Sequence, residues 1–166
     1  MIRKGDAGEI AVIADVINDG ARAYKDVIPP DRWQEPYMPM DYLTSEVGAG
    51  VEFWVDDLAG ELVGVMGIQD VKDVTLIRHA YVRTSSRRAG TGSKLIKFLQ
   101  DLTTRPLLIG TWTDATWAID FYKKHGFQMI TGTEKDALLD IYWTLPQRQI
   151  EESIVLADQR WFNRAD

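Results

Sequence analysis

A polar, glycine-bearing segment occupies Val82-Arg-Thr-Ser-Ser-Arg-Arg-Ala-Gly-Thr-Gly-Ser-Lys-Leu95. An apolar run ends where it starts, and the 3.6-residue apolar repeat of a helix begins where it ends. Glycines at 90 and 92 allow close approach of the backbone to a ligand, and the first amides of a helix attract anions. Arg87 and Arg88 add positive charge. The segment therefore predicts a strand–loop–helix cradle for a phosphate or pyrophosphate group.

Three better-known phosphate loops do not fit this segment. A Walker loop requires glycine directly before Lys-Ser/Thr, whereas Ser93 precedes Lys94 and Leu95 follows it. A dinucleotide fingerprint requires a third glycine at the position of Leu95, near the first strand of a parallel sheet. A kinase loop would need hundreds of further residues.

The patterns on either side predict an α/β protein with strands of mixed direction. We expect one domain over residues 1–145, with about seven strands and about four flanking helices. Residues 27–40 carry four prolines and predict an ordered loop. Residues 146–166 form an extension that could add a strand, pack as a helix or contact a partner. Helices are expected at 7–26, at 40–47 and at 115–125, and one more opens from the polar segment, carries apolar residues from Leu95 to Leu102 and is stopped by Pro106. Strands are expected at 51–55, 62–68, 74–82, 107–112, 127–130 and 138–145.

A second motif stands further along, at Ala118-Ile-Asp-Phe-Tyr-Lys-Lys-His-Gly-Phe127. It resembles the helix–strand motif Ala-x-x-Phe-Tyr-x-x-x-Gly-Phe of the GNAT N-acetyltransferase superfamily. Arg87-x-x-Gly90-x-Gly92, after the strand end Tyr81-Val82, resembles the acyl-CoA loop of the same superfamily. The resemblance covers about residues 2–145 and implies the GNAT fold.

The resemblance implies a direct transfer from acetyl-CoA, as co-substrate, to an amine. The acceptor nitrogen would attack the acetyl carbonyl, whose oxyanion would meet a backbone N–H near Val82. Tyr122 would act as general acid to the departing thiolate. Backbone groups of Ala80, Tyr81 and Val82 would hold the pantetheine arm. The residues implied around the pyrophosphate are Arg87, Arg88, Ala89, Gly90, Thr91, Gly92 and Ser93.

The chain departs from the superfamily pattern where a general base is usually supplied. Ala115 stands where many members carry asparagine, seven residues before the tyrosine. Gly110 stands where some carry a carboxylate on the fifth strand, and Thr75 or Leu76 where others carry glutamate on the fourth. His79 is the favoured base because an imidazole titrates near working pH, although a structural role for it is an equal alternative. The other candidates are Asp114, Glu35, Asp70 and a relayed water.

An acceptor pocket is expected from Trp33, Glu35 and Tyr37 in the proline-rich loop. In the superfamily, the segment joining the first two helices borders the acceptor site. The alternative is that these aromatic residues only anchor the loop by packing.

Composition excludes several other classes of protein. The 166 residues include no cysteine and two histidines, which removes disulfides, thiol nucleophiles and the common zinc sites. The net charge of −6 disfavours a nucleic-acid binder. No apolar run reaches about 18 residues, so no membrane span is expected. We therefore expect a cytoplasmic protein without metal, nucleic-acid or membrane partners. A homodimer is one assembly that the sequence allows.

These observations lead to one main functional hypothesis. The chain is expected to be an acyl-CoA-dependent N-acetyltransferase acting on a primary amine of a small molecule or amino acid. The alternatives are a non-catalytic acyl-CoA-binding sensor or scaffold, and a protein lysine or N-terminal acetyltransferase.

Overall fold

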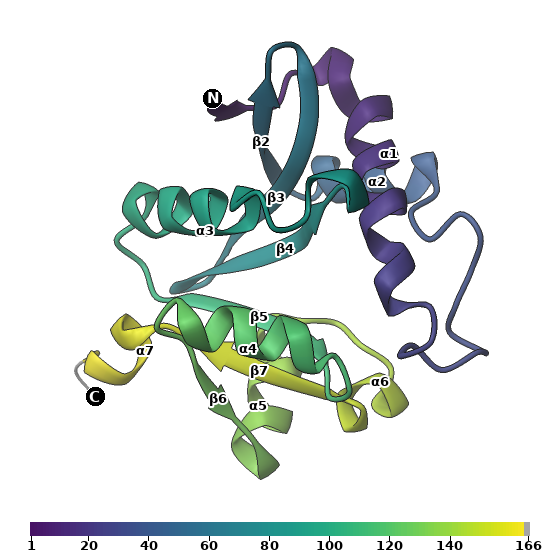
Figure 1. The fold of residues 1–166 in the computed structure, drawn as a ribbon. Coiled ribbons are helices and arrows are strands. Elements are labelled where there is room, and N and C mark those ends of the chain that lie inside the picture. Colours follow the sequence, from purple (N-terminus) through teal and green to yellow (C-terminus); the bar gives the residue numbers. More distant parts are fainter. Residues whose placement is uncertain (165–166) are drawn as a thin grey trace. The chain divides into compact units, whose positions relative to one another are not determined.

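A computed structural model describes residues 1–164 of the chain. Within these residues one sheet of seven strands has the order β1-β2-β3-β4-β5-β7-β6 (Figure 1). The chain divides into two compact units, the first holding Met1–Gln69 with Ile77–Leu102, and the second Asp70–Leu76 with the residues from Thr103 onward. Strand β4 (Val74–Val82) contributes residues to both units. The predicted α/β fold with a mixed sheet is confirmed.

The strands of the first unit begin with an antiparallel set. β1 (Ile2–Lys4) pairs with β2 (Glu52–Leu58), which pairs with β3 (Glu61–Val71). The β2–β3 turn consists of Ala59 and Gly60, with φ of +52° and +92°. Such two-residue turns with positive φ match the twist of the flanking strands. The hairpin therefore forms where the sequence predicts strands 51–55 and 62–68, and its strands extend further toward the turn than predicted.

Helices cover both faces of this hairpin. α1 (Ile10–Gly20) and α2 (Met40–Gly48) share a buried core with Phe53 of β2. The next residue, Trp54, points to the opposite face because side chains alternate along a strand. Its ring lies 5.1 Å from that of Phe98 in α3 (Thr91–Leu102). Short 3-10 turns at 7–9 and 21–24 flank α1, so the helix predicted for 7–26 is a helical segment in three parts.

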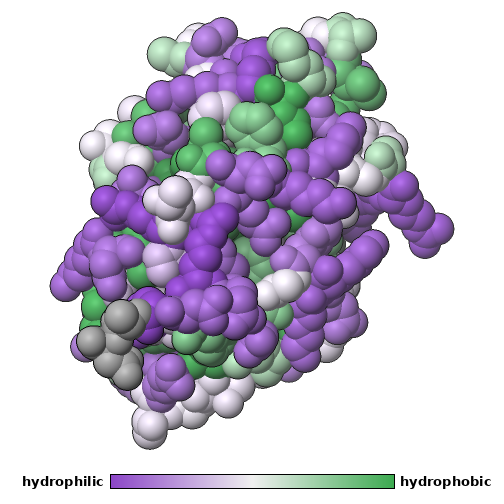
Figure 2. Space-filling view, turned by 90° about the vertical axis from the view of Figure 1, so that its left-hand side faces the viewer, coloured by the Kyte–Doolittle hydropathy of each residue, from purple (hydrophilic) through white to green (hydrophobic). Residues whose placement is uncertain are grey.

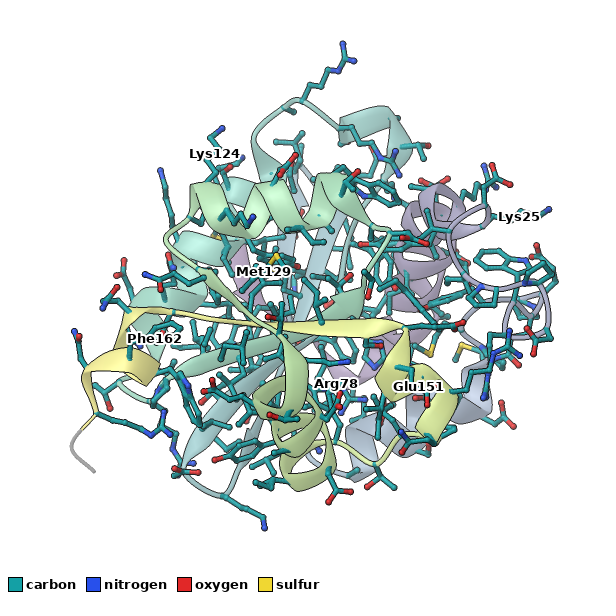
Figure 3. All side chains as sticks on the ribbon, turned by 90° about the horizontal axis from the view of Figure 1, so that it is seen from below. Lys25, Arg78, Lys124, Met129, Glu151 and Phe162 are labelled. Carbon is teal, nitrogen blue, oxygen red and sulfur yellow. The ribbon has the colours of Figure 1, made fainter. Side chains whose placement is uncertain are left out.

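The second unit is built on β5 (Leu107–Trp112), which pairs with β7 (Ser153–Ala157), which pairs with β6 (Gln128–Ile130). Figure 3 shows helices on opposite sides of β7. One side carries α4 (Thr116–Lys124), and the other carries α5 (Gly132–Tyr142). α6 (Gln147–Glu151) and α7 (Gln159–Asn163) flank β7 along the chain and add Ile150 and Trp161 to the core around α5.

The strand predicted for 138–145 is wrong. Residues 132–142 are helix α5, which buries Leu138 and Leu139 and leaves Ile141 48% exposed. That is the burial of one helix face, not the alternation of a strand. The strand paired with β5 comes instead from Ser153–Ala157, inside the segment expected to be an extension. All five of its residues are buried, as in a strand covered on both faces.

On the face in Figure 2, hydrophilic residues cover most of the area and hydrophobic residues gather in smaller separate areas.

Among residues 1–164, no helix has the length and apolarity that crossing a bilayer requires. In the same residues, no group of three or more His, Asp or Glu side chains is placed to hold a metal ion.

Candidate active site

The glycine loop has the backbone geometry of an anion cradle. After β4, Thr84–Ser86 form a single 3-10 turn, and residues 87–90 are exposed. Arg88 and Gly90 both have left-handed backbone conformations, with φ of +70° and +80°. α3 begins at Thr91, so the first amides of the helix follow the two reversals directly. Alternating backbone conformations before a helix N-terminus turn successive N–H groups to one side, which suits a phosphate group.

Helix α1 clamps the start of this loop. The Asp19 carboxylate accepts hydrogen bonds from the Thr84 backbone N–H at 2.7 Å and from the Thr84 hydroxyl at 3.1 Å. The Arg87 guanidinium donates to the Gly20 carbonyl at 3.2 Å. A Cβ on Gly20 would lie 2.9 Å from both Tyr81 Cβ and Val82 O, so only glycine allows this approach of α1 to the end of β4. The clamp fixes where the loop leaves the strand.

A second close approach places the N-terminus of α3. A Cβ on Gly64 of β3 would lie 2.6 Å from Thr91 Cγ2 and 3.1 Å from Leu95 Cδ1. Thr91 is 3% exposed, whereas Gly92 and Ser93 are partly exposed. The helix is therefore seated against β3 through its first residue, and the next two remain accessible.

The end of β4 presents partly exposed residues beside an aromatic cluster. Ala80, Tyr81 and Val82 are each partly exposed. The Tyr81 ring lies 5.9 Å from the Tyr24 ring and 6.0 Å from the Tyr37 ring, both edge to face. Its hydroxyl donates to the Tyr37 hydroxyl at 3.1 Å. Burial raises the pKa of Tyr37 above its ordinary value, so this phenol stays neutral and hydrogen-bonding.

The three acceptor-pocket candidates lie together in the first unit. The rings of Trp33 and Tyr37 are 5.4 Å apart, and Trp33 Nε1 donates to the Glu35 carboxylate at 2.8 Å. Glu35 is exposed and lies 3.9 Å from Lys25. Asn18 of α1 anchors the loop by accepting from Met38 N at 2.7 Å and donating to Met38 O at 3.2 Å. The predicted ordered loop is thus tied to α1.

His79 lies on β4 with a partner that the sequence did not indicate. Its Nε2 is 2.7 Å from Oε1 of Glu46, a residue of α2. The backbone at His79 has φ of +55°, an uncommon conformation inside a strand. In the sequence, Glu46 is one of several polar residues of α2, and the helical repeat does not set it apart from the others. A histidine and a carboxylate more than thirty residues apart carry no local signal of contact.

The remaining candidates belong to the second unit. Tyr122 of α4 is 6% exposed, with its ring 5.1 Å from Phe121 and 5.7 Å from Phe127. Asp114 is exposed after β5, and Asp70 accepts a hydrogen bond from the Thr75 hydroxyl at 2.6 Å. The acid role of Tyr122 and the base roles of Asp70 and Asp114 stay predictions.

A known protein family matches the part of the chain that carries the two sequence motifs. Residues 49–129 match the sequence model of a family described as the acetyltransferase (GNAT) domain. The chain contains a GNAT acetyltransferase domain. The matched range runs from β2 to β6 and so includes the glycine loop and the Tyr122 helix. The predictions of this family and of an acyl-CoA-dependent N-acyltransferase are confirmed.

Solved GNAT structures share the fold at low sequence identity. A GNAT-family acetyltransferase from Staphylococcus aureus aligns with a TM-score of 0.71 and 14% identity, over 96% of this chain and 98% of that one. The PaiA N-acetyltransferase from Thermoplasma acidophilum, solved with coenzyme A, gives 0.69 and 13%, over 95% and 97%. The ribosomal-protein-S18-alanine N-acetyltransferase from Escherichia coli gives 0.67 and 16%, over 95% and 92%. No curated protein matches the chain.

Proposed function

We propose that this GNAT domain transfers an acetyl group from acetyl-CoA to the primary amine of a small molecule or amino acid. The observation that carries the proposal is the pair of left-handed residues, Arg88 and Gly90, directly before α3. A Cβ at Gly90 would meet no atom within 4 Å, so the backbone there is open to a ligand. The residues present thus fit a pyrophosphate, which Arg88 and the amides of residues 88–93 would hold.

Acetyl-CoA supplies the activated acyl group, and the chain supplies binding, orientation and proton transfer. The amine nitrogen forms a bond to the acetyl carbon, and the carbon–sulfur bond breaks. His79 takes the proton that the nitrogen loses, and Tyr122 gives a proton to the CoA thiolate. The absence of cysteine agrees with a direct route without an acyl-cysteine intermediate.

An amine acceptor also agrees with the aromatic cluster of Trp33, Tyr37 and Tyr81. Aromatic faces attract cations, and Glu35 adds a negative charge beside Trp33. An amine that is protonated in solution would concentrate there and release that proton to solvent. It then reacts as the neutral amine, whose next proton passes to His79 as the nitrogen–carbon bond forms. The likeness to an S18-alanine N-acetyltransferase supports one second candidate, the N-terminal amine of a protein.

Release of free thiol tests this proposal. Purified protein would be incubated with acetyl-CoA and a panel of polyamines, amino acids, aromatic amines and N-terminal peptides. Release of CoA that depends on one class of amine supports the transferase and identifies its acceptor. Binding of acetyl-CoA without release on any amine would contradict the transferase and support the acyl-CoA sensor.

A further inference from the structure

A largely buried carboxylate contacts two neighbouring side chains on β4, Arg78 and His79. Oε1 of Glu46 lies 2.7 Å from His79 Nε2 and 2.8 Å from an Arg78 guanidinium nitrogen. The side chains of Glu46 and His79 are each 12% exposed. Arg78, labelled in Figure 3, also donates to Gln69 of β3 at 3.0 Å. Glu46 is thus held mainly from β4, and Tyr42 of its own helix adds a side-chain hydrogen bond.

The position of Glu46 is electrostatically unfavourable without these partners. It lies in the last turn of α2, where the helix dipole disfavours a negative charge. Partial burial disfavours that charge further. The hydrogen bond from His79, with the charge of Arg78, nevertheless lowers the pKa of Glu46 below its ordinary value. The group is therefore a carboxylate, which can only accept hydrogen bonds.

This acceptor determines which ring nitrogen of His79 carries the proton. Because the carboxylate accepts at Nε2, the neutral imidazole is protonated there and its lone pair lies on Nδ1. The ring is also held on its sides, stacked on Phe53 at 6.1 Å and perpendicular to Tyr42 at 6.3 Å. The backbone at His79 has a positive φ, an uncommon conformation for a residue other than glycine.

We propose that Glu46 is a positioning residue that holds His79 with Nε2 protonated, so that Nδ1 takes the proton from the acceptor amine. The inference rests on the proposed transferase activity. In the step, the lone pair of Nδ1 removes one proton from the nitrogen as the nitrogen–carbon bond forms. The imidazolium that results keeps its Nε2–H bond to Glu46, whose negative charge stabilises it. The proton returns to solvent after the acetylated product leaves.

The groups around His79 favour this assignment. Glu46 and Tyr42 face it from α2, and Phe53 faces it from β2. Arg78 is next to it on β4 and is paired with the same carboxylate. Burial raises the pKa of Tyr42, so its phenol is neutral near pH 7. Among these groups, Glu46 is therefore the anion that contacts His79 and can stabilise its imidazolium form.

Nitrogen NMR of His79 tests the positioning directly and needs no activity. The chain has two histidines, so a His125→Gln variant assigns the signals. We expect neutral His79 to show the Nε2–H tautomer in the intact protein. In Glu46→Gln, the share of the Nε2–H tautomer should fall, because the side-chain amide can donate to Nε2 as well as accept from it. An Nδ1–H tautomer in the intact protein, or an unchanged tautomer population in Glu46→Gln, would overturn the proposal.

The kinetic test uses the acceptor found in the thiol-release assay. Glu46→Gln should lower kcat/KM roughly 10- to 100-fold and move the acidic limb of its pH profile to lower pH, with acetyl-CoA affinity unchanged. Arg78→Met is the matched control, because it removes the other partner of the same carboxylate. An equal loss and an equal shift of the limb in Arg78→Met would show that Glu46 acts through Arg78, which would overturn the proposal.

Failure of this inference is distinguishable from failure of the proposed function. If the intact protein releases CoA with an amine and Glu46→Gln keeps its rate and pH profile, the transferase stands and the positioning role is lost. If the intact protein releases no CoA with any amine, the proposed function fails. The tautomer of His79 then still decides whether Glu46 positions the ring.

Discussion

The Asp19 carboxylate accepts a hydrogen bond from the backbone N–H of Thr84 at 2.7 Å, which ties the last turn of α1 to the first residue of the glycine loop. The same helix end receives the Arg87 guanidinium at the Gly20 carbonyl. The loop expected to hold pyrophosphate therefore takes its starting direction from a helix that lies more than sixty residues earlier in the chain.

Asp19→Ala should weaken CoA binding severalfold, because the loop loses the anchor that orders it. The lost hydrogen bonds should also lower the free energy of unfolding by roughly 1–2 kcal/mol. Calorimetric titration with CoA and urea unfolding measure the two effects. Asp15→Ala is the control, since Asp15 is exposed on the same helix. Equal affinities in the two variants would contradict the clamp.

Gly20→Ala and Gly48→Ala should change stability in opposite directions. The new Cβ at residue 20 would lie 2.9 Å from Val82 O, and relief of that clash should cost roughly 1–3 kcal/mol. At Gly48, the last residue of α2, a Cβ meets no atom within 4 Å, so alanine should stabilise by about 0.4–1 kcal/mol. Thermal unfolding of both variants checks the pair. A stable Gly20→Ala protein would contradict the close approach of α1 to β4.

Gly90→Ala should weaken CoA binding more than tenfold while leaving the domain folded. Gly60→Ala provides a control with the same kind of strain, because both glycines have positive φ and open space around them. Each variant should lose roughly 1–2 kcal/mol of stability from the left-handed conformation. Only the substitution at 90 should affect CoA. Undiminished affinity there would remove the pyrophosphate assignment.

Tyr122→Phe should lower kcat by roughly a hundredfold with little change in acetyl-CoA affinity, as loss of a general acid does. Tyr142→Phe is the control in the same unit, because its hydroxyl donates to Asp73 at 2.6 Å and lies outside the proposed chemistry. That control should lose stability and keep its turnover. Unchanged kcat in Tyr122→Phe would leave this tyrosine with a packing role alone, consistent with its contacts to Phe121 and Phe127.

The Arg3–Glu9 pair should make the first unit sensitive to acid. The Arg3 guanidinium, bonded to both oxygens of Glu9 at 2.8 and 2.7 Å, lowers the pKa of Glu9 to about 2 from 4.5. A depressed pKa stabilises the fold above the ordinary value, and this stabilisation is lost as pH falls toward about 2. The difference in unfolding free energy between the intact protein and Glu9→Gln should therefore shrink over that range. A constant difference would contradict the pairing.

Local patterns predicted strand β5 and the end of the α4 segment. β5 was expected at 107–112 and is found there, and Gly126 ends the α4 segment with φ of +89° as a left-handed cap requires. The error at 138–145 arose because short apolar runs fit a strand and a buried helix face about equally well. The place of Ser153–Ala157 between β5 and β6 depends on pairings between distant segments, which no local period encodes.

The candidate site was predictable only where it is made of contiguous residues. The loop at 87–93 and the Tyr122 helix are visible as motifs in the sequence. Other parts of the site are hydrogen bonds between elements that are distant in the sequence. These are the Glu46–His79 contact and the anchors made by Asn18 and Asp19. Such contacts follow from packing of α1 and α2 on the sheet, so they could be found only in the folded chain.

Every proposed step begins with CoA on the glycine loop, so calorimetric titration of the purified protein with CoA is the decisive experiment. We expect saturable binding to one site per chain, with affinity lost in Gly90→Ala and kept in Gly60→Ala. No binding by the folded intact protein, or equal binding by both variants, would contradict the assignment of this loop and the transferase built on it.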